Sequence, residues 1–136
     1  MNDKYEISNM KSQTSTKLQK ATSTPVYDLE DRTLLFAKDI RSFVRLIKKD
    51  IANNEDVKQL VRSSGSVGAN YIEANESLSK KDFAMRIKIS RKEAKESTYW
   101  LKLLNVDDNL EAERVRLTKE SIELMKILSA ILRSSE

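Results

Sequence analysis

A run of positively charged side chains between residues 79 and 104 is the group in this sequence best suited to binding chemistry. The segment holds eight Lys or Arg residues against three carboxylates, so it carries most of the basic excess behind the net charge of +4. Clustered cations bind nucleic-acid phosphates without reading sequence. The candidates for such contacts are Arg86, Lys88, Arg91, Lys92 and Lys95. Their spacing spreads them around more than half of a helix, so a solvated helix face is the alternative interpretation.

The segment SSGSVGAN, residues 63–70, superficially suggests a phosphate-binding loop. It lacks the Lys-Ser/Thr ending of such loops, and no strand is expected before it. The apolar period continues through both glycines, which favours one continuous helix over two short helices split by a loop. Small side chains in a helix let a neighbouring helix approach closely. The expected helix-packing or oligomer residues here are Ser64, Gly65, Gly68 and Ala69.

Three aromatic residues, Tyr71, Tyr99 and Trp100, adjoin apolar positions. Large aromatic side chains commonly anchor cores and interfaces, and stacking on nucleic-acid bases is the alternative role. The first and last predicted helices also carry broader apolar faces than one small bundle can cover. Surplus apolar surface of this kind marks interfaces, so the sequence predicts self-association.

Catalysis and metal binding are not expected. The carboxylate pairs Glu73–Glu76 and Glu93–Glu96 lack the histidine that accompanies such pairs in metal-binding bundles. The chain has no His and no Cys, which removes the commonest general base, thiol nucleophiles and zinc–thiolate sites. We expect Glu93 and Glu96 to neutralise neighbouring cations of their own helix. The sequence therefore predicts no enzyme, no catalytic residue, no metal and no cofactor.

The composition predicts a single helical domain. Of 136 residues, 39% are hydrophobic, 34% are charged, and only 2 are Gly and 1 is Pro. Residues 1–27 are polar without an apolar period, so we expect a disordered tail there and the folded domain over residues 28–136. No segment resembles a signal peptide or a membrane span. A cytoplasmic location without a membrane partner is expected.

Apolar residues at helical spacing predict an all-α fold of four helices. The first runs from residue 29 to about residue 50, is capped by Asp28, and has Ile51 at the end of its apolar stripe. The second runs from residue 57 to residue 75, with Asn54 as a possible cap.

The third predicted helix follows the cap Ser79, and the fourth runs from about residue 110 to residue 132. Short connections make sequential helices antiparallel, so an up-down-up-down four-helix bundle is the simplest arrangement.

Two blocks of this sequence resemble a known bacterial family. The first is LVRSSGSVGANYIEA at residues 60–74, and the second comprises residues 82–83, 89–97 and 99–104. Together they resemble the four-helix-bundle family known from 23S rRNA intervening-sequence proteins, over roughly residues 30–132. Many members carry Ala-Glu-Gly at the end of the first block, where this chain has Glu73-Ala74-Asn75.

The resemblance implies an antiparallel bundle that typically assembles as a ring-shaped pentamer and has no established enzymatic activity. It also points to a relative, the accessory variability determinant of diversity-generating retroelements, a basic pentamer that binds nucleic acid and works with a reverse transcriptase. Further copies of the chain, RNA or DNA, and a reverse transcriptase or other protein are thus the expected partners. The predicted function is non-enzymatic nucleic-acid binding by a homo-oligomer. The alternative is a protein–protein adaptor or a structural ring.

Overall fold

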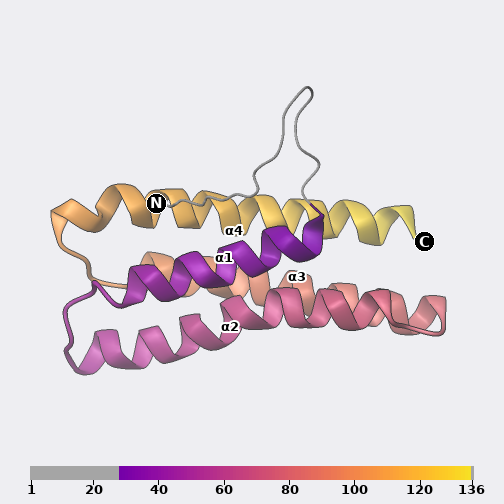
Figure 1. The fold of residues 1–136 in the computed structure, drawn as a ribbon, viewed down its shortest axis with the longest axis horizontal. Coiled ribbons are helices and arrows are strands. Elements are labelled where there is room, and N and C mark those ends of the chain that lie inside the picture. Colours follow the sequence, from indigo (N-terminus) through magenta and orange to yellow (C-terminus); the bar gives the residue numbers. More distant parts are fainter. Residues whose placement is uncertain (1–27, 136) are drawn as a thin grey trace.

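Four helices form an antiparallel bundle in which the chain reverses direction at each connection (Figure 1). The computed structural model describes residues 28–135. Its helices are α1 (Leu29–Val44), α2 (Ile51–Asn75), α3 (Lys80–Leu103) and α4 (Asp108–Ser134). The predicted all-α four-helix fold is confirmed. The predicted disordered tail, residues 1–27, lies outside the described residues.

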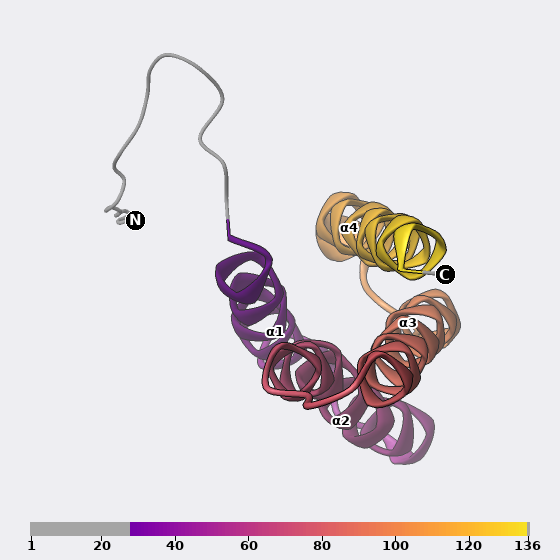
Figure 2. The same ribbon diagram turned by 90° about the vertical axis from the view of Figure 1, so that its right-hand side faces the viewer.

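The helices follow one another around the bundle, with α2 between α1 and α3 and with α4 beside α3 (Figure 2). The α2–α3 contact is the most extensive, and the α1–α4 contact is the sparsest. Each helix supplies apolar side chains to one continuous core. Its largest fully buried members are Phe36, Phe43, Ile40, Leu60, Ile87, Leu101, Leu104, Leu117, Leu124, Leu128 and Val67. Within residues 28–135, no helix is both long and apolar enough to cross a membrane.

Side-chain caps fix the starts of α1 and α3 as predicted. Asp28 accepts a hydrogen bond from the backbone N–H of Glu30 at 3.1 Å. Ser79 accepts one from the backbone N–H of Asp82, also at 3.1 Å. Each cap satisfies an N–H group that has no partner inside its own helix.

The connection between α1 and α2 differs from the sequence prediction. Both boundaries come earlier than predicted, because α1 ends at Val44 and α2 begins at Ile51. The predicted cap Asn54 is wrong: the carboxylate of Asp50 caps α2 by accepting a hydrogen bond from the backbone N–H of Asn53 at 2.7 Å. Ile51 was expected in the apolar stripe of the first helix, but it is 88% exposed in the first turn of α2.

The α1–α2 and α3–α4 connections lie at the same end of the bundle (Figure 1), and the buried side chain of Asn53 joins them. Its Nδ2 donates to the carbonyl oxygens of Lys48 at 3.1 Å and Asn105 at 2.9 Å. Its Oδ1 accepts a hydrogen bond from the backbone N–H of Asn105 at 3.1 Å. The α1–α2 connection is therefore bonded to the α3–α4 connection through one residue.

The two glycines of α2 lie where α1 crosses it, and α2 is continuous through both, as predicted. A Cβ atom at Gly68 would lie 2.8 Å from the Oγ1 of Thr33. This hydroxyl donates to carbonyls in the preceding turn of α1, so it is not free to move away. A Cβ atom at Gly65 would instead meet the guanidinium of Arg41 at 3.2 Å, at the flexible end of a long side chain.

The two glycines should therefore respond differently to alanine. We expect Gly68→Ala to lower the free energy of unfolding by about 1–2 kcal/mol, because overpacking outweighs the gain in helix propensity. Gly65→Ala should leave it unchanged or raise it by up to about 1 kcal/mol. Urea denaturation followed by circular dichroism measures both values. Equal responses would contradict the assignment of Gly68 to a close helix contact.

Candidate functional site

Four of the five predicted basic residues line one hollow between α3 and α4. They recur at intervals of three and four residues, which places them on one side of α3. Their counterparts on α4 are an apolar and a small polar side chain, and the hollow has a volume of about 480 Å³. We call it the basic hollow, and its lining residues are Lys88, Arg91, Lys92, Lys95, Met125 and Ser129.

No carboxylate among residues 28–135 forms an ion pair with the four cations of the basic hollow. Glu93 and Glu96 lie among these cations in sequence but contact the guanidinium of Arg62 in α2 instead, with Glu93 at 3.3 Å. The prediction that these two acids neutralise cations of their own helix is therefore wrong. Because α3 turns its acidic side chains toward α2, the side facing α4 keeps its positive charge.

Arg86 does not join the other predicted cations. Its Nη1 donates to the Oδ1 of Asn70 in α2 at 3.1 Å. It lines a separate hollow together with the acidic residues Glu73, Glu76 and Asp82. Arg86 thus belongs to the α2–α3 side of the bundle and not to the basic hollow.

The predicted packing residues of α2 divide between the interior and the surface. Ser64 and Gly68 are buried, whereas Ala69 is exposed. Ala69 lies in a groove of about 230 Å³ between α1 and α2. Two large apolar side chains line this groove while remaining exposed, Leu34 at 54% and Ile72 at 45%. The α1–α2 groove is therefore an apolar surface as well as a close helix contact.

The predicted aromatic residues also occupy different environments. Tyr71 and Trp100 are half-buried and pack against the core. The indole Nε1 of Trp100 is buried and finds no acceptor within the described part of the chain. Tyr99 is 58% exposed, and its ring meets that of Trp100 edge to face at a centroid distance of 5.0 Å and an interplanar angle of 77°. Tyr99 is thus the aromatic side chain of the three that faces solvent most.

Sequence reasoning missed the polar contacts that bind α2 to α3. The Oγ of Ser90 donates to the carbonyl oxygen of Val67 at 2.6 Å. The hydroxyls of Ser63 and Ser97 lie 2.8 Å apart and share a hydrogen bond. All three serines are fully buried. The only signal in the sequence was the presence of serines within an otherwise apolar stripe.

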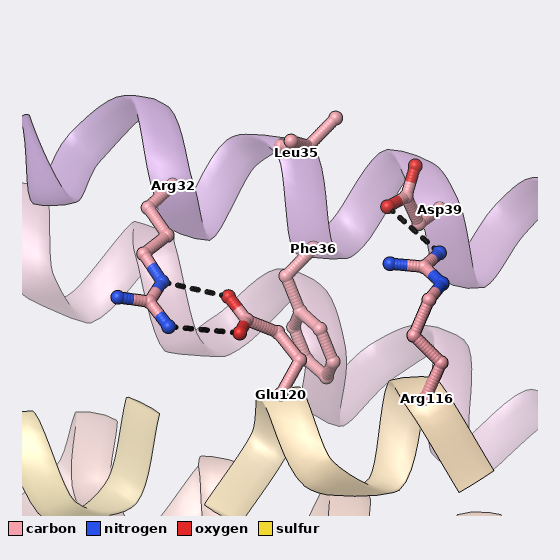
Figure 3. A pocket seen from close by; sticks show the side chains of 6 residues that line it. All are labelled: Arg32, Leu35, Phe36, Asp39, Arg116 and Glu120. Atoms are coloured by element: carbon pink, nitrogen blue, oxygen red, sulfur yellow. Dashed lines mark hydrogen bonds and ion pairs between the residues drawn. The ribbon is translucent and has the colours of Figure 1, made fainter. Parts of the chain in front are cut away.

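A further hollow of about 370 Å³ lies between α1 and α4 and is framed by ion pairs (Figure 3). The Nε and Nη2 of Arg32 donate to the two carboxylate oxygens of Glu120 at 2.8 and 2.9 Å. The Nη2 of Arg116 donates to the Oδ2 of Asp39 at 3.2 Å. The buried ring of Phe36 lies between the two pairs. Because cations and carboxylates face one another here, this seam serves to hold α1 against α4.

The two ion pairs of the α1–α4 seam are not equivalent. Burial raises the pKa of Asp39 even though Arg116 acts to lower it. Hydrogen bonds to Glu120 and Glu113 are the main causes that raise the pKa values of Arg32 and Arg116, respectively. Ionised Asp39 is therefore unfavourable in the folded state, whereas the Arg32–Glu120 pair is favourable. Among residues 28–135, no group of three or more acidic side chains is placed to hold a metal ion.

Comparison with known proteins identifies the family. The sequence model of the 23S rRNA-intervening sequence protein family matches residues 28–130. The chain belongs to this family. The predicted resemblance is confirmed at that level, and the link to retroelement proteins stays a prediction.

A solved structure gives the same result. The chain is similar to a protein of unknown function from the S23 ribosomal protein family of Bacteroides thetaiotaomicron, with 30% sequence identity and a TM-score of 0.64. The similarity covers 77% of this chain and 98% of that chain. Comparison with curated proteins gives no match. The family thus supports the four-helix fold and leaves the biochemical role to be argued from the surface.

The two ion pairs of the α1–α4 seam predict opposite responses to neutralising substitutions. Glu120→Gln should lower the free energy of unfolding by about 1 kcal/mol at pH 7, because Arg32 loses a bidentate charged partner. Asp39→Asn should be neutral or stabilising at pH 7. Urea denaturation of both variants at pH 7 checks this ordering.

The second check on the seam is the pH dependence. A carboxyl group whose pKa is raised on folding binds its proton more tightly in the folded state, so its protonation favours folding as the pH falls. Any advantage of Asp39→Asn over the parent chain should therefore shrink between pH 7 and pH 4. An advantage that grows on acidification would overturn the assignment of Asp39 as a buried, unfavourable charge.

Proposed function

We propose that this protein is a non-enzymatic, nucleic-acid-binding member of its family that acts as a homo-oligomer. The observation that carries the proposal is the basic hollow, in which Lys88, Arg91, Lys92 and Lys95 gather around one depression between α3 and α4. Four cations at helical spacing form a row that suits a row of phosphates. An oligomer would repeat the row and multiply the positive field.

The surroundings of the basic hollow favour a polyanionic ligand over a small charged molecule. The hollow is an open depression along a helix–helix seam, and its α4 side offers only Met125 and Ser129. No acidic side chain of residues 28–135 forms an ion pair with its cations. A nucleic-acid backbone meets the four cations at several points, and each contact releases a condensed counterion.

Salt dependence and charge removal test the proposal. If one protomer neutralises about four phosphates, the logarithm of the binding constant should fall with the logarithm of salt concentration with a slope of about −3. The double substitution Arg91→Gln, Lys92→Gln should weaken binding and reduce the steepness of the slope by about half, to about −1.5. Fluorescence anisotropy with a labelled mixed-sequence RNA, from 50 to 300 mM KCl, measures both.

A matched double variant controls for the loss of net charge. Lys48→Gln, Lys49→Gln removes the same charge from two exposed residues of the α1–α2 connection, outside the basic hollow. This variant should keep the parent slope. Equal losses in the two double variants, or binding that ignores salt, would contradict a nucleic-acid site in the basic hollow.

The self-association part of the proposal is supported by the α1–α2 groove. Leu34 and Ile72 line it and are exposed, and small residues of α2 complete the lining on that helix. A second copy that covers this groove would remove both apolar side chains from water. A different protein in the same groove would correspond to the adaptor function.

A pair of leucine substitutions tests self-association. Leu34→Glu should reduce the mass of the assembly, because it places a charge in the proposed interface. Leu46→Glu is the control, since Leu46 is 66% exposed and does not line the groove. Sedimentation or light scattering of the purified proteins gives the masses. A monomeric parent chain, or the same mass in both variants, would count against the groove as a self-association surface.

A further inference from the structure

The seam between α3 and α4 contains a second hollow in line with the basic hollow. Its volume is about 340 Å³, and its lining residues are Lys102, Glu111, Arg114, Val115, Thr118 and Lys119. On α3, Lys102 follows Lys95 by seven residues, and on α4, Thr118 precedes Met125 by seven. Residues seven apart lie on nearly the same side of a helix, so both hollows open to the same side of the seam.

The two hollows differ in what they can bind. The first is lined by four cations. The second is lined by Val115, which is 43% exposed, and by charged residues of both signs: Glu111 and Arg114 pair with each other, and Lys102 and Lys119 complete the lining. A hydrogen bond of 2.6 Å between the hydroxyls of Thr98 and Ser121 closes the seam between them. The seam thus presents a cationic half and, in series, a half that also offers exposed apolar surface at Val115.

Tyr99 stands on α3 between the two halves. It follows Lys95 by four residues and precedes Lys102 by three, so it shares the outer stripe of α3 with these lysines. Four residues of helix advance about 6 Å along the axis, which places the Tyr99 ring within one nucleotide of a phosphate held at Lys95. The ring is 58% exposed, and its edge-to-face contact with Trp100 restricts its orientation.

We propose that the α3–α4 seam binds single-stranded nucleic acid, with phosphates over the basic hollow and one base stacked on Tyr99 beside the second hollow. This inference rests on the proposed nucleic-acid binding and names the kind of strand. In a duplex the bases are paired and stacked on one another, so an exposed tyrosine beside a row of lysines gains nothing from them. In a single strand each base has a free face, and proteins that bind such strands combine a cationic track with aromatic platforms.

The alternative occupant of this surface is a second copy of the chain covering Tyr99. That arrangement would make Tyr99 an interface anchor and would place the second hollow inside the assembly. The charges favour the nucleic acid, because a second copy that covered Tyr99 would also have to cover the positive charges of Lys95 and Lys102. The mass of the assembly distinguishes the two occupants.

The test compares single and double strands with matched variants at Tyr99. The ligands are a labelled 12-nucleotide RNA, the DNA of the same sequence, their duplexes, and an abasic strand of equal phosphate number. Tyr99→Leu should weaken binding of both single strands about 5- to 100-fold, the effect of losing one base stack, and should not change the salt slope. Tyr99→Phe keeps the ring and should bind as the parent does. Duplexes and the abasic strand should not distinguish the variants.

Trp100 provides an independent reading, because it is the only tryptophan of the chain and contacts the Tyr99 ring. Its fluorescence should change when single-stranded RNA binds and should not change with the abasic strand.

Each contrary result separates the two proposals. Salt-dependent binding with equal affinity for single and double strands, and no loss in Tyr99→Leu, would overturn the single-strand inference and leave nucleic-acid binding in place. Absence of salt-dependent binding to every ligand would overturn both. A smaller assembly in Tyr99→Leu than in the parent chain would assign Tyr99 to a subunit interface and overturn the stacking role.

Discussion

The close approach of α2 to both of its neighbours is the constraint on which the rest of the bundle depends. On one side, Gly68 leaves room for Thr33 of α1. On the other side, Ser90 donates directly to the backbone of α2 at Val67. Such contacts exist only where side chains are small, so they determine how α1 and α3 are turned about their own axes. The orientation of α3 then decides the surface: its buried serines, with Glu93 and Glu96, face α2, and the four cations of the basic hollow are left toward α4.

Much of this fold was predictable because it depends on local sequence patterns, namely apolar periodicity and helix caps. Periodicity located four helices, and Asp28 and Ser79 marked two of the starts. The α1–α2 connection was not predictable by the same means. Two acceptor side chains, those of Asp50 and Asn54, compete as caps within a few residues, and the choice depends on Asn53. The side chain of Asn53 bonds to Asn105, which is 52 residues away in sequence. A contact over that separation cannot be predicted from a local sequence pattern.

The candidate site shows the same division between local and distant information. The sequence identified the cations of α3 and their spacing. It did not show which side of α3 would pack against α2 and which against α4. Arg86 forms a hydrogen bond with Asn70 of α2 and so lies apart from the basic hollow. Glu93 and Glu96 form ion pairs with Arg62, also of α2. These tertiary contacts sort the charges of one helix into an acidic side and a basic side, and no property of the helix alone fixes that outcome.

The bonds of Asn53 make the two ends of the bundle unequal in how their segments are joined. Both connections at its end are bonded to each other, whereas the opposite end contains the α2–α3 turn and a hydrogen bond of 2.9 Å from the Nδ2 of Asn75 to the Oε2 of Glu30 (Figure 1). The bonds of Asn53 restrain α3 and α4 directly at the connection that joins them. Along α3, Lys102 lies near that connection and Lys88 lies about four helical turns away from it, so the second hollow is closer to the restraint than the basic hollow is. The hydrogen bonds of Asn53 therefore support the half of the seam that contains the second hollow more directly than the cationic half.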